Sequence, residues 1–77
     1  VNINEWCVLL ICMGLVMALE MTNSAIEGIV DLISPDYNEK AGKIKDLAAG
    51  AVLIASIISF IIGMIIFWKY FLVFFTN

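Results

Sequence analysis

The chain has 77 residues, of which 64% are hydrophobic and only 14% are charged, and its net charge is −3 at neutral pH. Ordinary soluble domains are about half apolar and a quarter charged, and a chain this short buries one small core at best. The composition therefore argues against a soluble domain, and the size excludes a soluble nucleotide-binding fold. The lipid bilayer is the solvent that this sequence favours.

Two segments are long enough to span a bilayer, which requires about 20 mostly apolar residues in a helix. We expect one all-α membrane domain that forms an antiparallel transmembrane helix hairpin. Its first helix covers residues 5–33 and has a polar end. Residues 34–39 form a turn, and residues 40–75 form a second helix that begins amphipathic and becomes fully apolar after Asp46.

The ends of both helices carry recognisable signals. Asn2 or Asn4 is placed to cap the first helix, and Asp36 or Asn38 is placed to cap the second. Pro35 disfavours helix in the residue before it, so the first helix should stop near Ser34.

Lysine positions predict the orientation. Lys40, Lys43 and Lys45 lie in the connection between the spans, and only Lys69 lies elsewhere. By the positive-inside rule, residues 34–46 are cytoplasmic and both ends of this chain face outward.

Polar residues of the first helix fall on one stripe. At about 100° per residue, Glu20, Asn23, Glu27 and Asp31 lie at about 0°, 300°, 340° and 20°. Ser24 and Ser34 fall on the same side. A carboxylate in or near a bilayer is costly and indicates a functional site.

The second helix carries a stripe of small residues that runs down from Lys45. Its members are Ala48, Ala49, Val52, Ser56, Ser59 and Gly63. Small residues let membrane helices approach closely, so this stripe is expected to pack near the acidic one. A lone hairpin would leave much of the acidic stripe facing lipid. We therefore expect further helices, from additional chain or from oligomerisation.

Three interpretations of the acidic stripe remain open from spacing alone. In a metal–phosphate site, Glu27 with another acid would bind Mg²⁺, and Lys45 would contact nucleotide phosphates. Glu20, about 10 Å deeper along the helix, would then position or deprotonate a lipid alcohol, and Asn23 would orient either group. The stacked acids also suit an ion- or proton-translocating subunit. The third interpretation is a non-catalytic accessory hairpin whose polar residues hold helices together.

Two motifs resemble those of the prokaryotic diacylglycerol kinase family. Residues 20–31, E-M-T-N-S-A-I-E-G-I-V-D, resemble the signature E-x-x-N-[ST]-A-I-E-x-x-V-D. Residues 45–53, K-D-L-A-A-G-A-V-L, resemble K-D-x-[AG]-[AS]-x-A-V-L. The resemblance extends over about residues 5–70.

The resemblance implies a kinase that phosphorylates a membrane lipid alcohol with MgATP in the bacterial cell membrane, and no nucleic-acid partner. Family members are homotrimers with three membrane helices per protomer and active sites shared between protomers. By resemblance, Glu20 is the catalytic base and Glu27 is a metal ligand. The nucleotide-site positions are matched by Asn23, Asp31, Lys45 and Asp46.

One subgroup of the family acts on diacylglycerol and another on undecaprenol. Residues 34–37 and 45–53 look more like the undecaprenol type, which we favour.

Two features depart from the family pattern. Compared with the family pattern, the sequence begins at the second membrane helix, so we expect a fragment without the N-terminal surface helix and first membrane helix, which carry a second metal-binding glutamate. Tyr37-Asn38 stands where many members have Tyr-His.

Overall fold

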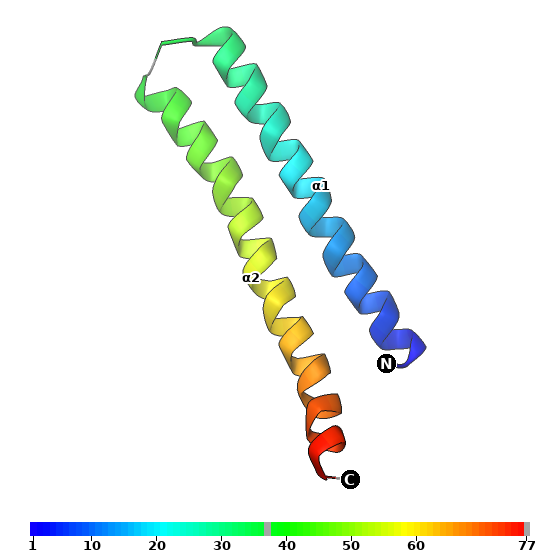
Figure 1. Ribbon diagram of the computed structural model, residues 1–77. Coiled ribbons are helices and arrows are strands. Elements are labelled where there is room, and N and C mark those ends of the chain that lie inside the picture. Colours follow the sequence, from blue (N-terminus) through cyan, green and yellow to red (C-terminus); the bar gives the residue numbers. More distant parts are fainter. Residues whose placement is uncertain (37, 77) are drawn as a thin grey trace.

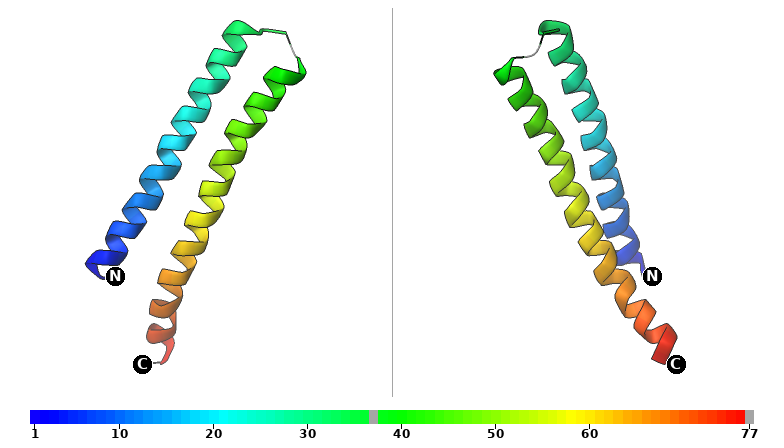
Figure 2. Two further views of the ribbon diagram at one scale, coloured as in Figure 1. Left: turned by 180° about the vertical axis from the view of Figure 1, so that it is seen from behind. Right: turned by 60° about the vertical axis from the view of Figure 1, so that its left-hand side comes forward.

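Two long helices form an antiparallel hairpin in the computed structural model, which describes residues 1–36 and 38–76. Helix α1 covers Ile3–Ile33, and helix α2 covers Glu39–Thr76. The helices lie side by side in all views, and both chain ends lie at the end of the hairpin opposite the connection (Figures 1 and 2). The molecule measures 60 × 19 × 12 Å, so its long axis exceeds the hydrocarbon thickness of a bilayer, about 30 Å.

Helix α1 begins with a capping box. The Asn2 side chain accepts a hydrogen bond from the Glu5 backbone N–H at 2.8 Å, and the Asn2 N–H donates to Glu5 Oε1 at 3.0 Å. These bonds satisfy two backbone donors that a helix start leaves without partners. The helix ends at Ile33, directly before Ser34 and Pro35, as expected.

Asn38 caps helix α2 and ties it to the end of α1. Its side-chain oxygen accepts from the Ala41 N–H at 2.8 Å, and its carbonyl accepts from the Gly42 N–H at 3.0 Å. Its amide nitrogen also donates to Ser34 Oγ at 2.5 Å. Asn38, one of the two residues expected to depart from the family pattern, therefore serves as the N-cap of α2. Tyr37, the other residue of that departure, lies outside the described residues.

The two helices contact each other along one narrow seam, whose residues recur at alternating intervals of four and three, as in a coiled coil. On α1 the half-buried residues are Glu5, Leu9, Cys12, Val16, Leu19, Asn23, Ile26 and Val30. On α2 the residues with this spacing are Ala41, Lys45, Ala48, Val52, Ala55, Ser59, Ile62 and Ile66, and beside them Gly42, Gly50, Ser56, Gly63 and Tyr70 are also half-buried. Within the described ranges, only Ala55 and Ile66 are buried, at 8% and 9% exposure. The seam therefore includes much of the expected small-residue stripe, displaced toward Ala55.

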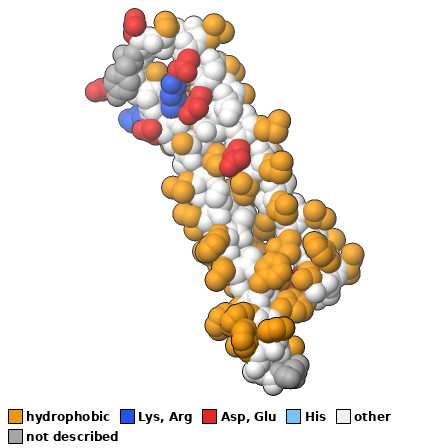
Figure 3. Space-filling view, in the orientation of Figure 1, with side chains coloured by type: hydrophobic (Ala, Val, Ile, Leu, Met, Phe, Trp, Pro, Cys, Tyr) orange, Lys and Arg blue, Asp and Glu red, His pale blue; other side chains and the backbone are white. Residues whose placement is uncertain are grey.

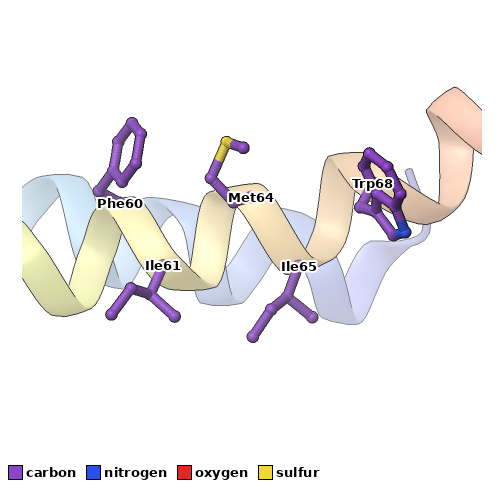
Figure 4. Close-up of a pocket in the computed structure, with 5 residues that line it drawn as sticks. All are labelled: Phe60, Ile61, Met64, Ile65 and Trp68. Carbon is purple, nitrogen blue, oxygen red and sulfur yellow. The ribbon is translucent and has the colours of Figure 1, made fainter.

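The remaining surface is apolar over most of its length. Both helices are long and apolar enough to cross a membrane. On the face seen in Figure 3, most charged side chains gather toward the connection, and hydrophobic side chains are numerous along the rest of the hairpin. Figure 4 shows five apolar side chains that project from α2 alone and line an open depression of about 370 Å³, namely Phe60, Ile61, Met64, Ile65 and Trp68. Such a surface suits lipid or further helices.

Replacing Asn38 with alanine should destabilise the start of α2 by about 1 kcal/mol, because the Ala41 N–H loses its acceptor. Hydrogen exchange at the Ala41 and Gly42 amides should accelerate accordingly. Asn4→Ala is the matched control, because Asn4 is exposed and accepts no helix-capping bond among the described residues. Unchanged exchange at Ala41 would contradict the capping role.

Candidate functional site

Three carboxylates of the acidic stripe lie on an open side of α1. Glu20, Glu27 and Asp31 are all exposed. Glu27 and Asp31 are one helical turn apart, a spacing that brings Cβ atoms to within about 5–6 Å. Glu20 lies two turns further from the connection, about 10 Å along the helix axis. Along α1, moving away from the connection, Asp31 and Glu27 therefore come first as neighbours, and Glu20 follows alone in a more apolar part of the helix.

Asn23 occupies a different place from its acidic neighbours. It is half-buried on the seam that faces α2, and its Oδ1 atom is buried without a hydrogen-bond partner in the described part of the chain. A buried amide oxygen without a partner costs free energy. The structure thus divides the predicted stripe, with Asn23 between the helices and the three carboxylates beside them.

Lys45 and Asp31 form an ion pair across the two helices. The Lys45 side chain is 35% exposed and the Asp31 side chain is 64% exposed. Antiparallel packing brings the start of α2 to the level of the end of α1, as the sequence predicts. The contact places a lysine ammonium beside Asp31, one turn from Glu27, where a phosphate could replace the carboxylate as its partner.

Asp46 is the remaining predicted site residue of α2. It is exposed, and it follows Lys45 by one residue, which turns its side chain by about 100° around the helix. No ion pair to Asp46 occurs within residues 1–36 and 38–76. The structure therefore brings Lys45 to Asp31 and leaves Asp46 on another side of α2.

The donor set for a metal is incomplete within this hairpin. Residues 1–36 and 38–76 contain no group of three His, Cys, Asp or Glu side chains placed to hold a metal ion. Mg²⁺ commonly uses only one or two carboxylates together with substrate phosphates. The exposed carboxylate of Glu27, one turn from Asp31, fits this kind of partial site.

A shallow depression surrounds Glu20. It has a volume of about 460 Å³ and is lined by Met17, Glu20, Met21 and Ser24. A second groove of about 420 Å³ also includes Met17 in its lining. This groove lies between α1 and α2 and extends toward the end of the hairpin opposite the connection. Its lining is Leu9, Cys12, Met13, Val16, Met17, Ser56, Ser59 and Phe60. Glu20 thus lies in a depression that meets an apolar groove at Met17.

Sequence reasoning missed a second polar contact between the helices, at the end away from the connection. There, Glu5 pairs with Lys69 and accepts a hydrogen bond from Tyr70. The available signal was the isolation of Glu5 and Lys69, which are single charges near the outer ends of two antiparallel apolar helices.

Comparison with known proteins identifies the family of this hairpin. Residues 1–67 match the family model described as prokaryotic diacylglycerol kinase. The chain belongs to this family. The match includes all of α1, the connection and most of α2, so every candidate site residue lies within it.

Curated members of the family include two clear relatives. An undecaprenol kinase of Bacillus subtilis is 44% identical over 66 residues, which cover 86% of this chain and 54% of that protein. A diacylglycerol kinase of Escherichia coli is 47% identical over 57 residues, which cover 74% of this chain and 47% of that protein. The chain spans about half the length of these curated relatives.

Replacing Asn23 with leucine should stabilise the packing of α1 on α2 by about 1 kcal/mol, because a buried polar atom without a partner is removed from the seam. Thermal unfolding in detergent micelles, followed by circular dichroism, measures the change. Ser24→Leu is the control, because Ser24 is the exposed neighbour of Asn23 and should leave the transition unchanged. A lower transition temperature for Asn23→Leu would contradict the seam position.

Proposed function

We propose that this hairpin carries the catalytic stripe of a membrane lipid kinase, which transfers the γ-phosphoryl group of MgATP to a lipid alcohol at the cytoplasmic face. The main support is one spatial relation within a chain of this family. The ion-paired Lys45 and the acids Glu27 and Asp31 lie near the connection, and Glu20 lies about 10 Å deeper on the same open side.

The residues near the connection suit a nucleotide. The Lys45 ammonium, released from Asp31, would contact ATP phosphates as a point charge. Asp31 and Asp46 would hold polar groups of the nucleotide, and Asn23, at the seam between them and Glu20, would orient the site. The lysines of residues 34–46 support a cytoplasmic position for this end, since the positive-inside rule places such loops there.

Glu27 is the residue that we assign to the metal. Its exposed carboxylate offers the oxygen ligand that Mg²⁺ prefers, and phosphate oxygens and water supply most of the remaining positions in sites of this kind. When bound, Mg²⁺ would neutralise charge on the transferring phosphoryl group. A second protein ligand would come from outside these two helices.

Glu20 is placed to handle the lipid hydroxyl. Its carboxylate lies beside an apolar groove, so a lipid whose hydrocarbon follows the groove would bring its alcohol to the acid. Glu20 would accept a hydrogen bond from the hydroxyl and remove its proton as the oxygen attacks the γ-phosphorus. The transferred group moves from ATP to the lipid oxygen, and ADP leaves.

The exposure of the acidic side of α1 supports an assembly with more helices. We propose a homotrimer in which neighbouring protomers complete each site, because a carboxylate facing hydrocarbon is costly. A neighbouring helix would cover Glu20 and Glu27 and contribute the second metal ligand.

Glu20→Gln should reduce phosphorylation of a lipid alcohol by about 10²–10⁴-fold, because glutamine cannot accept the proton. Glu27→Gln should reduce activity and also raise the Mg²⁺ concentration needed for half-maximal rate, because glutamine is a weaker metal ligand. Transfer of radiolabel from ATP, measured with the complete protein in lipid vesicles, gives both quantities. Glu39→Gln is the control, because Glu39 is an exposed acid at the start of α2. Full activity in either site variant would refute the assignment.

Undecaprenol should be phosphorylated with a higher kcat/KM than diacylglycerol. The relative named undecaprenol kinase aligns over 86% of this chain, whereas that named diacylglycerol kinase aligns over 74%. The same radiolabel assay with each alcohol in matched vesicles measures the ratio. A preference for diacylglycerol would overturn the substrate assignment and leave the lipid-kinase proposal standing, whereas no transfer to either alcohol would overturn both.

A further inference from the structure

The two helices are joined by polar contacts at both ends of the hairpin. The contact away from the connection centres on Glu5, whose Oε2 atom lies 2.6 Å from Lys69 Nζ. Its Oε1 atom accepts a hydrogen bond from the Tyr70 hydroxyl at 2.5 Å and another from the Asn2 N–H at 3.0 Å. One carboxylate therefore joins the N-cap of α1 to the last part of α2.

Glu5 is well placed for a specific contact. Its side chain is 13% exposed, whereas that of Lys69 is 57% exposed. The acid sits within the seam, with Val8 and Ile66 among its neighbours in a small groove. Hydrogen bonds to an ionised group are shorter and stronger than neutral ones, so this contact has a geometry that apolar packing lacks.

The seam between the two ends specifies axial alignment only weakly. Its residues repeat in a heptad pattern, so sliding one helix by three, four or seven residues again places seam residues opposite one another. The glycines do not interlock the helices either, since a Cβ added at Gly14, Gly50 or Gly63 would meet no neighbour within 4 Å. Polar contacts that fit only one alignment are the device that selects a register in such pairs.

We propose that Glu5, Lys69 and Tyr70 form a register lock, a group of positioning residues that fixes the axial alignment of α1 and α2. In the locked alignment Lys45 meets Asp31. The lock and the Lys45–Asp31 contact lie nearly the same number of residues apart on both helices, so a single alignment satisfies both. The consequence for phosphoryl transfer rests on the function proposed above, whereas the alignment itself does not.

A slip of the helices would separate the candidate site residues. A shift of three or four residues moves one helix by about 5 Å along the other, which takes Lys45 beyond hydrogen-bond reach of Asp31. Five residues separate the two helices in sequence, and five extended residues reach at most about 17 Å, so chain length alone does not prohibit such a shift. The lock therefore acts at a distance from the acids, through rigid helices.

Spin labels can report the alignment directly. Leu10 and Ile44 are both exposed and lie far apart along the hairpin axis. After replacement of both with cysteine and labelling, the distance between the two labels changes by almost the same amount as the axial shift of the helices. Cys7→Ser and Cys12→Ala remove the native thiols. The complete protein is labelled, diluted with unlabelled protein to suppress distances between molecules, and measured in lipid vesicles by pulsed electron resonance.

The parent protein should give one narrow distance distribution. Glu5→Lys should add a population shifted by about 5 Å, and the charge exchange Glu5→Lys with Lys69→Glu should restore the narrow distribution. Glu5→Gln and Tyr70→Phe should broaden the distribution less, which keeps a test available if Glu5→Lys fails to fold. Glu39→Lys is the control, because it makes the same charge change at an exposed acid in the first turn of α2.

A single unshifted distribution in both Glu5→Lys and Glu5→Gln, or a failure of the charge exchange to restore the parent distribution, would overturn the lock. In a kinase, Glu5→Lys should also raise KM for ATP and lower kcat, and the exchange should recover both. A shifted alignment in a protein whose parent transfers no phosphate would retain the lock and refute the proposed function. If the parent is active and its alignment does not respond to these variants, the register lock would be refuted and the proposed function would stand.

Discussion

Contact along a single narrow seam is the constraint on which the rest of the hairpin depends. Along each helix, only about one residue in every three or four lies at the centre of this contact. Within the described ranges, just Ala55 and Ile66 become buried. Most of the circumference of both helices remains open to lipid or to other helices. The same geometry leaves Glu20 and Glu27 accessible, because the seam passes through Asn23, about 60° and 40° away around the helix.

Local features of the hairpin could be predicted from sequence because neighbouring residues determine them. The cap by Asn2, the stop before Pro35 and the cap by Asn38 all act within four residues of the chain. The approach of Lys45 to Asp31 also follows from sequence, since a short connection between antiparallel helices brings their adjoining ends to about the same level, within a helical turn or so. The hairpin and the position of Lys45 along its axis are therefore predictable from the sequence.

The rotation of α1 about its own axis could not be predicted from the sequence. A polar stripe about 100° wide does not say which edge faces α2, and the answer depends on how the small residues of α2 dock. As a result Asn23, expected beside the acids, lies between the helices. The contact of Glu5 with Lys69 and Tyr70 was missed for a related reason, because it joins residues that are distant in sequence and belong to no recurring motif.

Charge is distributed unevenly along the hairpin axis, and this distribution limits how the site can work. The Lys45–Asp31 pair and the Glu5–Lys69 pair each neutralise an acid at one end. Glu20, between them, has no ion pair in the described part of the chain, and its immediate surroundings include Met17 and Met21. An acid left uncompensated among apolar side chains costs free energy in a bilayer unless another polar group approaches it. In the trimer and the reaction proposed above, a neighbouring helix or a lipid hydroxyl would supply that group.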